Sequence, residues 1–273
     1  MDSAIAKLCV AAARDVYSRA TIQTARAHVL IRTTSAVPID AAPESSTSAN
    51  GSTVIVVAFR GTRCVRDFIT DAEFFRIPFF VCAGDAEPAG AVHAGFLLGT
   101  RSVIDTVHDA IISLQTAAGS LPVFLTGHSL GAAQAKLAAM ILERRGVAVA
   151  GVYSFGSPRV GDRRFRDAYD AGSNSQAPGA TPLAARTFRF VNQLDIVPRV
   201  PGWLAGFRHV GQCEFFMPPD APFALPLVTN PHLWLMALSD GWGIWRDYRI
   251  AHELSALEDH HIDRYVAEME TLP

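Results

Sequence analysis

The chain has 273 residues, of which 49% are hydrophobic, and its formal net charge at pH 7 is −2. This length and apolar content suffice for one large domain with a sizeable core. The charge is nearly balanced and no long basic run occurs, which argues against a nucleic-acid partner. No apolar run approaches the roughly 20 residues that span a bilayer, so the composition excludes a typical membrane-spanning protein.

The first residues do not resemble a good signal peptide. Lys7 and Arg14 leave only residues 8–13 free of charge, whereas the apolar region of a signal peptide usually has about 7–15 residues. We therefore expect a cytoplasmic protein, with a secreted form whose leader has been removed as the open alternative. The cysteines are scattered without metal-ligand spacing and are expected to be free thiols. They are Cys9, Cys64, Cys82 and Cys213, and a bridge between Cys64 and Cys82 stays open.

Helical and strand patterns alternate from the start of the chain. Apolar residues at helical spacing predict a helix over residues 3–20, and Val29 begins a candidate strand. Residues 37–52 have the composition of an exposed loop. The apolar run 54–59 is typical of a buried parallel strand. A short amphipathic helix is expected over residues 63–76, with an apolar face of Val65, Phe68, Ile69 and Ala72.

The alternation continues after a turn-rich loop at 84–90. The expected elements are a helix at 100–118, a strand at 123–126, a helix at 130–145, strands at 147–155 and 187–191, and a helix within 252–270. Such alternation implies right-handed crossovers and a mostly parallel central sheet with helices on both faces. The predicted fold class is α/β, as a single domain over residues 1–273.

The strand at 123–126 runs into the turn Gly127-His128-Ser129-Leu130-Gly131 and then into a helix. The pattern G-x-S-x-G in this context predicts a nucleophile elbow, in which a strained turn leaves a serine hydroxyl available for attack. A Cβ at either glycine would collide with the neighbouring strand or helix. Small residues after the turn let the helix approach the sheet, and Gln134 and Lys136 are expected on its outer side. The alternative is an ordinary turn with a serine N-cap.

A serine nucleophile needs a base, normally a histidine that is oriented by a carboxylate. Asp195 is the best candidate for the carboxylate, because it follows a predicted strand at the edge where catalytic groups collect. Its alternative is a loop carboxylate in an Asx turn. The pattern does not choose among the histidines that follow, which are His209, His232, His252, His260 and His261.

Five short motifs, in order over residues 54–200, resemble the class 3 (fungal-type triacylglycerol) lipases. The motifs are Phe59-Arg60-Gly61-Thr62, His93-x-Gly95-Phe96, Gly127-His128-Ser129-Leu130-Gly131, Phe155-Gly156-Ser157-Pro158-Arg159-Val160-Gly161 and Val191-Asn192-x-x-Asp195-Ile196-Val197-Pro198. Near the end, Asp259-His260 with Tyr265 resembles the catalytic-histidine segment of this family. The resemblance implies the α/β-hydrolase fold with a short lid helix.

The resemblance also implies roles for individual residues. Ser129 is the expected nucleophile, Asp195 the acid and His260 the base, with His261 and then His252 as the alternatives for the base. The backbone N–H groups of Thr62 and Leu130 would form the oxyanion hole. The lid would be the helix at 63–76, and the Asp71 carboxylate would stabilise the position of the Thr62 hydroxyl when this lid opens. His93 is expected to make a structural hydrogen bond.

The expected function is that of a lipase, a serine hydrolase that cleaves carboxylic esters of lipids through an acyl-enzyme. The implied partners are a lipid or ester substrate and a transient lipid interface, with no metal and no organic cofactor. The sequence leaves the oligomeric state open. The alternatives are a phospholipase or a feruloyl-type esterase on the same scaffold, an acyltransferase and, more remotely, a non-catalytic binding protein. The aromatic stretch 215–245 would line the acyl groove or form a packing or dimer surface.

Overall fold

The computed structural model describes residues 1–36, 52–62, 75–171, 181–192, 195–216 and 260–272. Several expectations lie outside these residues: the loop at 37–51, the apolar face of the helix at 63–76, and most of the aromatic stretch 215–245. At the end of that expected helix, Phe75 is not helical and Arg76 begins a strand. The helix therefore does not extend to residue 76.

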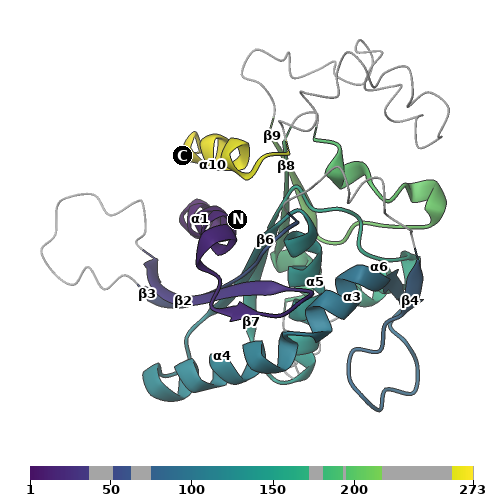
Figure 1. Cartoon of the computed structure of the whole chain (residues 1–273), viewed down its shortest axis with the longest axis horizontal. Helices are drawn as coiled ribbons and strands as arrows, with labels where there is room; N and C mark the ends of the chain where they lie inside the picture. Colours follow the sequence, from purple (N-terminus) through teal and green to yellow (C-terminus); the bar gives the residue numbers. More distant parts are fainter. Residues whose placement is uncertain (37–51, 63–74, 172–180, 193–194, 217–259, 273) are drawn as a thin grey trace, which may run out of the picture.

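A mixed sheet forms the centre of the described part of the chain (Figure 1), with seven strands in the order β1-β2-β3-β6-β7-β8-β9. The strands are β1 Ile22–Gln23, β2 His28–Ala36, β3 Ser52–Phe59, β6 Val123–His128, β7 Val149–Phe155, β8 Thr187–Asn192 and β9 Gln212–Phe216. Pairing is parallel from β3 to β9 and antiparallel from β1 to β3. The mostly parallel sheet predicted from the alternation is confirmed, and β1 and β2 add an antiparallel edge.

Helices cover both faces of this sheet (Figure 1). The helices are α1 Ser3–Arg19, α3 Ala94–Arg101, α4 Ile104–Ala118, α5 Leu130–Arg144, α6 Arg163–Ala171 and α10 Ile262–Glu270, with 3-10 turns η1 Leu183–Arg186, η2 Val197–Arg199 and η3 Trp203–Ala205. On one face, α1 and α10 pack together over Tyr153, Phe155 and Phe190. On the other, the apolar sides of α3, α4 and α5 form the larger core. No described helix is long and apolar enough to cross a membrane.

The helix expected at 100–118 is two helices. The chain is already helical from Ala94, and it breaks at Ser102 and Val103 before α4 begins. Two hydroxyls bind main-chain carbonyls of the preceding turn: Thr100 Oγ1 donates to Phe96 O at 2.9 Å, and Ser102 Oγ donates to Gly99 O at 2.8 Å. Such bonds compete with helical pairing of the backbone and favour a break. A small hairpin of β4 Arg76–Pro78 and β5 Ala91–His93 precedes these helices.

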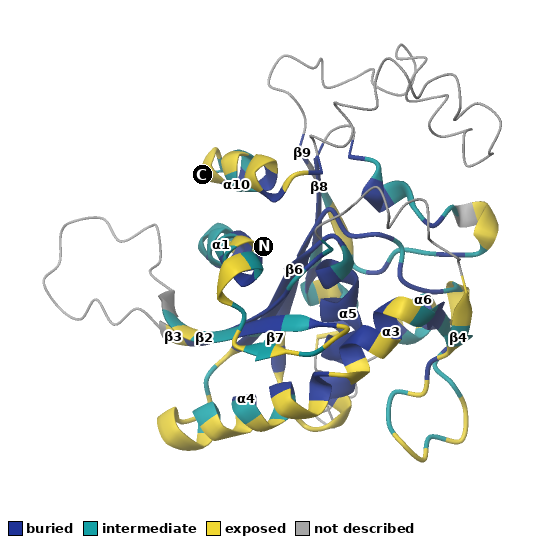
Figure 2. Ribbon diagram, in the orientation of Figure 1, coloured by how far each residue is buried: buried dark blue, intermediate teal, exposed yellow. Residues whose placement is uncertain are grey.

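The expectation that Gln134 and Lys136 mark the outer side of α5 is wrong, because both side chains are fully buried. The reason is that α5 is covered away from the sheet as well. A Cβ added to Gly99 of α3 would collide with Gln134 Nε2, and Lys136 Nζ donates to Ser157 Oγ at 2.7 Å. Figure 2 shows α5 as the most completely buried helix, whereas α4 has an exposed side.

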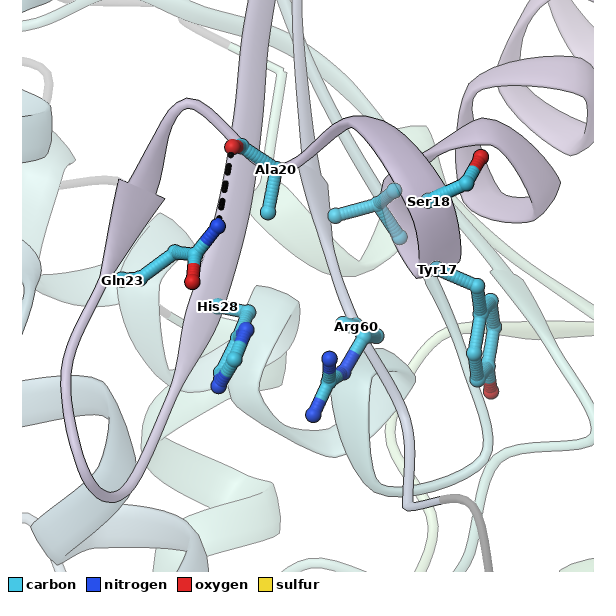
Figure 3. A pocket seen from close by; sticks show the side chains of 7 residues that line it. Tyr17, Ser18, Ala20, Gln23, His28 and Arg60 are labelled. Atoms are coloured by element: carbon cyan, nitrogen blue, oxygen red, sulfur yellow. Dashed lines mark hydrogen bonds between the residues drawn. The ribbon is translucent and has the colours of Figure 1, made fainter.

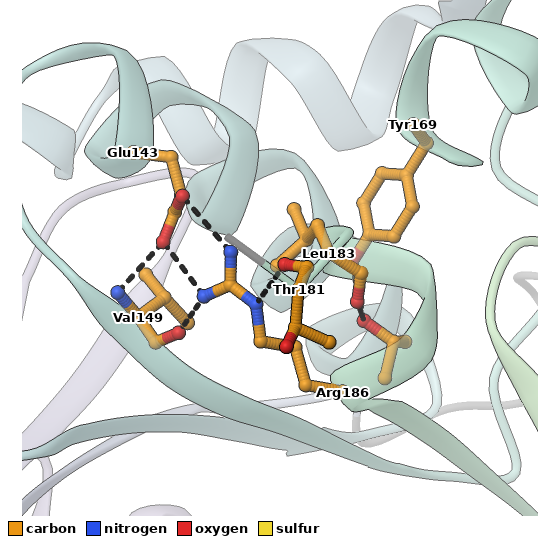
Figure 4. Close-up of polar contacts among 7 residues, drawn as sticks. Glu143, Val149, Tyr169, Thr181, Leu183 and Arg186 are labelled. Carbon is orange, nitrogen blue, oxygen red and sulfur yellow. Dashed lines mark hydrogen bonds and ion pairs between the residues drawn. The ribbon is translucent and has the colours of Figure 1, made fainter. Parts of the chain in front are cut away.

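An ion pair between the buried Glu143 and the partly buried Arg186 ties the end of α5 to two strands (Figure 4). Arg186, just before β8, donates two parallel hydrogen bonds to Glu143, at 2.9 Å from Nη1 and 3.1 Å from Nη2. Glu143 Oε1 also accepts from the N–H of Val149 at the start of β7, at 2.8 Å. Bidentate geometry of this kind fixes direction as well as distance. The pair therefore holds the helix that follows Ser129 in register with β7 and β8.

Candidate active site

Ser129 occupies a strained turn between β6 and α5. Its φ is 58° and its ψ is −128°, and it is the one non-glycine residue with positive φ in the part of the chain described here. A Cβ on Gly127 would collide with the backbone of Gly131, and a Cβ on Gly131 would collide with the carbonyl of Phe59. The Ser129 N–H donates to Phe155 O at 3.0 Å. This geometry agrees with the nucleophile elbow predicted from the sequence.

Asp195 and His260, which are 65 residues apart, form a buried pair. His260 Nδ1 lies 2.9 Å from Asp195 Oδ1 and 2.8 Å from Oδ2, and both side chains are at most 1% exposed. Two further donors hold the carboxylate: the Val197 N–H reaches Oδ1 at 2.8 Å, and the Tyr265 hydroxyl reaches Oδ2 at 2.5 Å. The carboxylate thus orients the histidine ring and fixes the proton at Nδ1.

Gly156 makes room for this pair. It follows β7, has φ 56°, and donates its N–H to Phe190 O at 3.0 Å. A Cβ added there would lie 2.8 Å from Asp195 Oδ2 and 2.9 Å from His260 Nδ1, both shorter than van der Waals contact. The glycine stands in a motif used for the family resemblance, but its neighbours lie 39 and 104 residues away, so this contact could not be predicted from the spacing of the residues.

The two atoms that a triad would join, Ser129 Oγ and His260 Nε2, are buried. Neither is hydrogen-bonded to the other or to another atom of the described residues. The loop before Thr62 lies against the serine, since a Cβ on Gly61 would be 3.1 Å from Ser129 Cβ. Leu130 is the first residue of α5, so its N–H is one of the amides that a helix leaves without an internal partner. Ser129 follows His128, whose ring lies 4.5 Å from that of His260 between centroids. The elbow serine, the loop before Thr62 and the imidazole of His260 therefore lie in one region.

The other histidines are placed differently. His261 is exposed, and its Nδ1 lies 3.4 Å from Asp263 rather than near Asp195. His209 is held at Pro198 O, at 2.7 Å from Nε2, and His232 and His252 lie outside the described residues. His93 does not make the structural hydrogen bond expected of its ring: both ring nitrogens lack a partner, and the ring stacks on Phe96 at 4.2 Å between centroids. Burial lowers the pKa of His93 to about 4.

The structure does not describe two expected parts of the site. Asp71 and residues 63–74 of the lid lie outside the described residues.

Within the described part of the chain, no cluster of histidine, cysteine or acidic side chains could hold a metal ion. Cys9, Cys82 and Cys213 are free thiols, and Cys64 is not described.

Comparison with known proteins agrees with this geometry. A sequence model of the family Lipase (class 3) matches residues 56–205. This chain belongs to the class 3 lipase family. A secreted mono- and diacylglycerol lipase of Fusarium solani is 31% identical over 202 residues, 74% of this chain and 49% of that protein. Secreted mono- and diacylglycerol lipase A of Penicillium cyclopium is 30% identical over 169 residues, 62% of this chain and 50% of that protein.

A solved structure supports the fold. The lipase of Rhizopus microsporus var. chinensis superposes with a TM-score of 0.53 at 26% identity, covering 78% of this chain and 72% of that one. The chain thus has the α/β-hydrolase fold of the fungal class 3 lipases. It spans about half the length of the Fusarium and Penicillium relatives.

The cytoplasmic location expected from the sequence is contradicted, because the Fusarium and Penicillium relatives are secreted lipases by name. The expectation depended on the absence of an apolar leader in the first residues. Those residues form α1, whose apolar side packs in the core with Tyr153 and Tyr265. They belong to the folded domain, so their composition carries no information about a targeting segment.

Proposed function

We propose that this chain is a lipase, a serine hydrolase that cleaves carboxylic esters of acylglycerols and acts outside the cell. One observation carries the proposal: the buried Asp195–His260 pair lies beside His128, the residue before the elbow serine Ser129. Two secreted relatives of this family are mono- and diacylglycerol lipases by name, which supports the substrate class. We also propose that residues 1–273 form one catalytic domain.

The chemistry follows from the positions of the three side chains. Ser129 Oγ attacks the acyl carbonyl and gives its proton to His260 Nε2, while Asp195 stabilises the imidazolium through Nδ1–H. The N–H groups of Leu130 and Thr62 stabilise the tetrahedral oxyanion. The intermediate collapses, and His260 gives the proton to the leaving alcohol. Water then attacks the acyl-serine with His260 as base, which releases the carboxylic acid and restores the Ser129 hydroxyl.

The substrate class is tested with a panel. Hydrolysis would be measured on p-nitrophenyl esters of increasing chain length, on tributyrin and longer glycerides, on phosphatidylcholine and on methyl ferulate. Ser129→Ala serves as the control for each substrate. A lipase should cleave glycerides and aliphatic esters. Preferred cleavage of phosphatidylcholine or methyl ferulate would replace the acylglycerol assignment with the phospholipase or aryl-ester assignment.

A lid within residues 63–74 stays a prediction from the sequence. Its apolar face should disfavour the open form in water and favour it at a lipid surface, because exposing a large apolar side chain costs about 1.5–3 kcal/mol. The tributyrin rate should then rise sharply as its concentration passes the solubility limit. A smooth hyperbola through that limit would argue for a fixed cover and for soluble substrates.

Asp71→Ala should lower the hydrolysis rate on both dissolved and emulsified substrate, because Thr62 would be held less firmly.

A further inference from the structure

One close contact and two hydrogen bonds link the loop before Thr62 to the backbone of His260. The Tyr17 hydroxyl packs against Gly61, where an added Cβ would lie 2.5 Å from it, and it lies 3.0 Å from His128 Nδ1. On the other side of the imidazole, His128 Nε2 lies 2.6 Å from the carbonyl oxygen of His260. The chain therefore connects α1, the loop after β3, the elbow and the segment that precedes α10.

The direction of each bond follows from the groups involved. A carbonyl oxygen only accepts, so His128 donates from Nε2 to His260. A neutral imidazole with its proton on Nε2 has a bare Nδ1, which accepts from the Tyr17 hydroxyl. The Tyr17 hydroxyl therefore donates to His128, and the carbonyl of His260 sets the direction of both hydrogen bonds.

Burial keeps this arrangement neutral. His128 is 4% exposed, and desolvation holds its pKa well below the ordinary value. Desolvation likewise raises the pKa of Tyr17 to about 12. Protonation of His128 would place a second N–H against the Tyr17 hydroxyl and reverse the bond. Because neither group changes charge near neutral pH, the bond directions persist where an esterase works.

The Tyr17 hydroxyl packs closely against Gly61. A Cβ on Gly61 would lie 2.5 Å from the Tyr17 hydroxyl and 3.1 Å from Ser129 Cβ. The imidazoles of His128 and His260 lie 4.5 Å apart between centroids. Tyr17 also lines a pocket of about 450 Å³ together with His28 and Arg60 (Figure 3). Tyr17 is thus partly exposed at that pocket, while its hydroxyl is hydrogen-bonded to His128.

We propose that Tyr17 and His128 are positioning residues that set the distance between the oxyanion loop and the catalytic base. This inference rests on the proposed function, in which Thr62 and His260 have those roles. Thr62 follows Gly61 directly, so a shift of the backbone at Gly61, against which Tyr17 packs, moves the oxyanion donor. His260 is held at its carbonyl by His128 and at its ring by Asp195. Tyr17 lies before residue 56, where the match to the family model begins.

The test compares Tyr17→Phe with a matched control, Tyr169→Phe. Tyr169 is fully buried, whereas Tyr17 is partly buried, and the Tyr169 hydroxyl makes a comparable bond, at 2.9 Å to Thr187 Oγ1, in the core on the α5 face of the sheet (Figure 4). Each variant loses one phenol hydrogen bond, and Tyr169→Phe should lose at least as much thermal stability as Tyr17→Phe because its bond is more buried. Since misplacement by about 1 Å can cost roughly 100-fold in rate, Tyr17→Phe should lower kcat by about 10- to 100-fold with little change in KM. Tyr169→Phe should leave kcat near the wild-type value.

A second measurement does not depend on activity. In a histidine-labelled sample at pH 7, ring 15N shifts should show His128 as neutral with the proton on Nε2, and the signal is assigned by its loss in His128→Gln. His128→Gln keeps an acceptor and a donor and should retain more kcat than His128→Leu, which keeps neither.

The outcomes separate the two proposals. An Nδ1–H tautomer or a charged ring at His128 would overturn the hydrogen-bond chain, whatever the activity. Equal kcat in Tyr17→Phe and Tyr169→Phe would show that Tyr17 is merely structural, while the proposed function would stand. Wild-type activity in Ser129→Ala would remove the proposed function, and the shifts would still test the chain itself.

Discussion

A methyl group added to Gly156 would lie 2.9 Å from His260 Nδ1, on the side where that nitrogen meets Asp195. Gly156→Ala should therefore push the two side chains apart. Because the orientation of the base depends on the carboxylate, we expect kcat to fall by at least about 100-fold, as for other small misplacements. The measurement is steady-state hydrolysis of p-nitrophenyl butyrate beside thermal unfolding.

Gly146→Ala is the matched control for that variant. Gly146 also has positive φ, at 88°, but nothing lies within 4 Å of an added Cβ. It should show the backbone strain of a left-handed alanine, about 1–2 kcal/mol, without loss of kcat. If both variants lose the same activity, backbone strain rather than the contact with His260 explains the effect.

The adjacent residues His260 and His261 give a second prediction. His260→Ala should lower kcat by about 10⁴–10⁶, as removal of a triad member does. His261→Ala should stay within a few-fold of wild type, because its side chain is exposed and faces Asp263. The two variants would be compared on the same ester after circular dichroism has shown that both are folded. An inactive His261→Ala with an active His260→Ala would contradict the assignment of the base.

The buried amine of Lys136 predicts a pH-dependent stability. Desolvation, with Arg189 close by, holds the pKa of Lys136 well below its ordinary value in the folded state. The unfolded chain then binds more protons than the folded one below about pH 10, so this lysine lowers stability increasingly as the pH falls. Lys136→Met should raise the free energy of unfolding, with a larger gain at pH 7.5 than at pH 9.

Urea unfolding of wild type and Lys136→Met at these two pH values measures the difference. His209 packs in the same region, and its pKa is held well below the ordinary value. It is therefore neutral in both states at pH 7.5 and above, and it does not confound the comparison. A gain that is equal at both pH values would show that Lys136 is charged in the folded protein.

The sequence predicted those parts of the site whose chemistry is local. Ser129 sits in a short motif between a strand and a helix, and Asp195 follows a strand, so both could be named from neighbours in the chain. Which histidine meets Asp195 is a contact over 65 residues, and spacing left five candidates until the family resemblance favoured His260. The sequence did not indicate a role for Tyr17 for the same reason, because the residues that it contacts, Gly61 and His128, lie in other segments of the chain.

Two expectations about the helices were wrong because they depend on contacts that helical periodicity does not reveal. Gln134 and Lys136 are polar and fall between apolar positions, which normally indicates a solvent-facing side. That expectation failed because each side chain is covered by another segment, Gln134 by α3 and Lys136 by the segment around Ser157. The break at Ser102 depends on side-chain hydroxyls that bind the backbone, which helical periodicity does not reveal.

The central claim is that Ser129 is the nucleophile of an ester hydrolase, and labelling by a serine-reactive fluorophosphonate tests it most directly. The labelled site would be mapped by peptide mass spectrometry while hydrolysis of p-nitrophenyl butyrate is followed in the same sample. The account predicts one adduct, on Ser129, that forms in step with the loss of activity. It also predicts that folded Ser129→Ala is unlabelled and slower by about 10⁴–10⁶. An adduct on another residue, or a folded Ser129→Ala with wild-type activity, would contradict it.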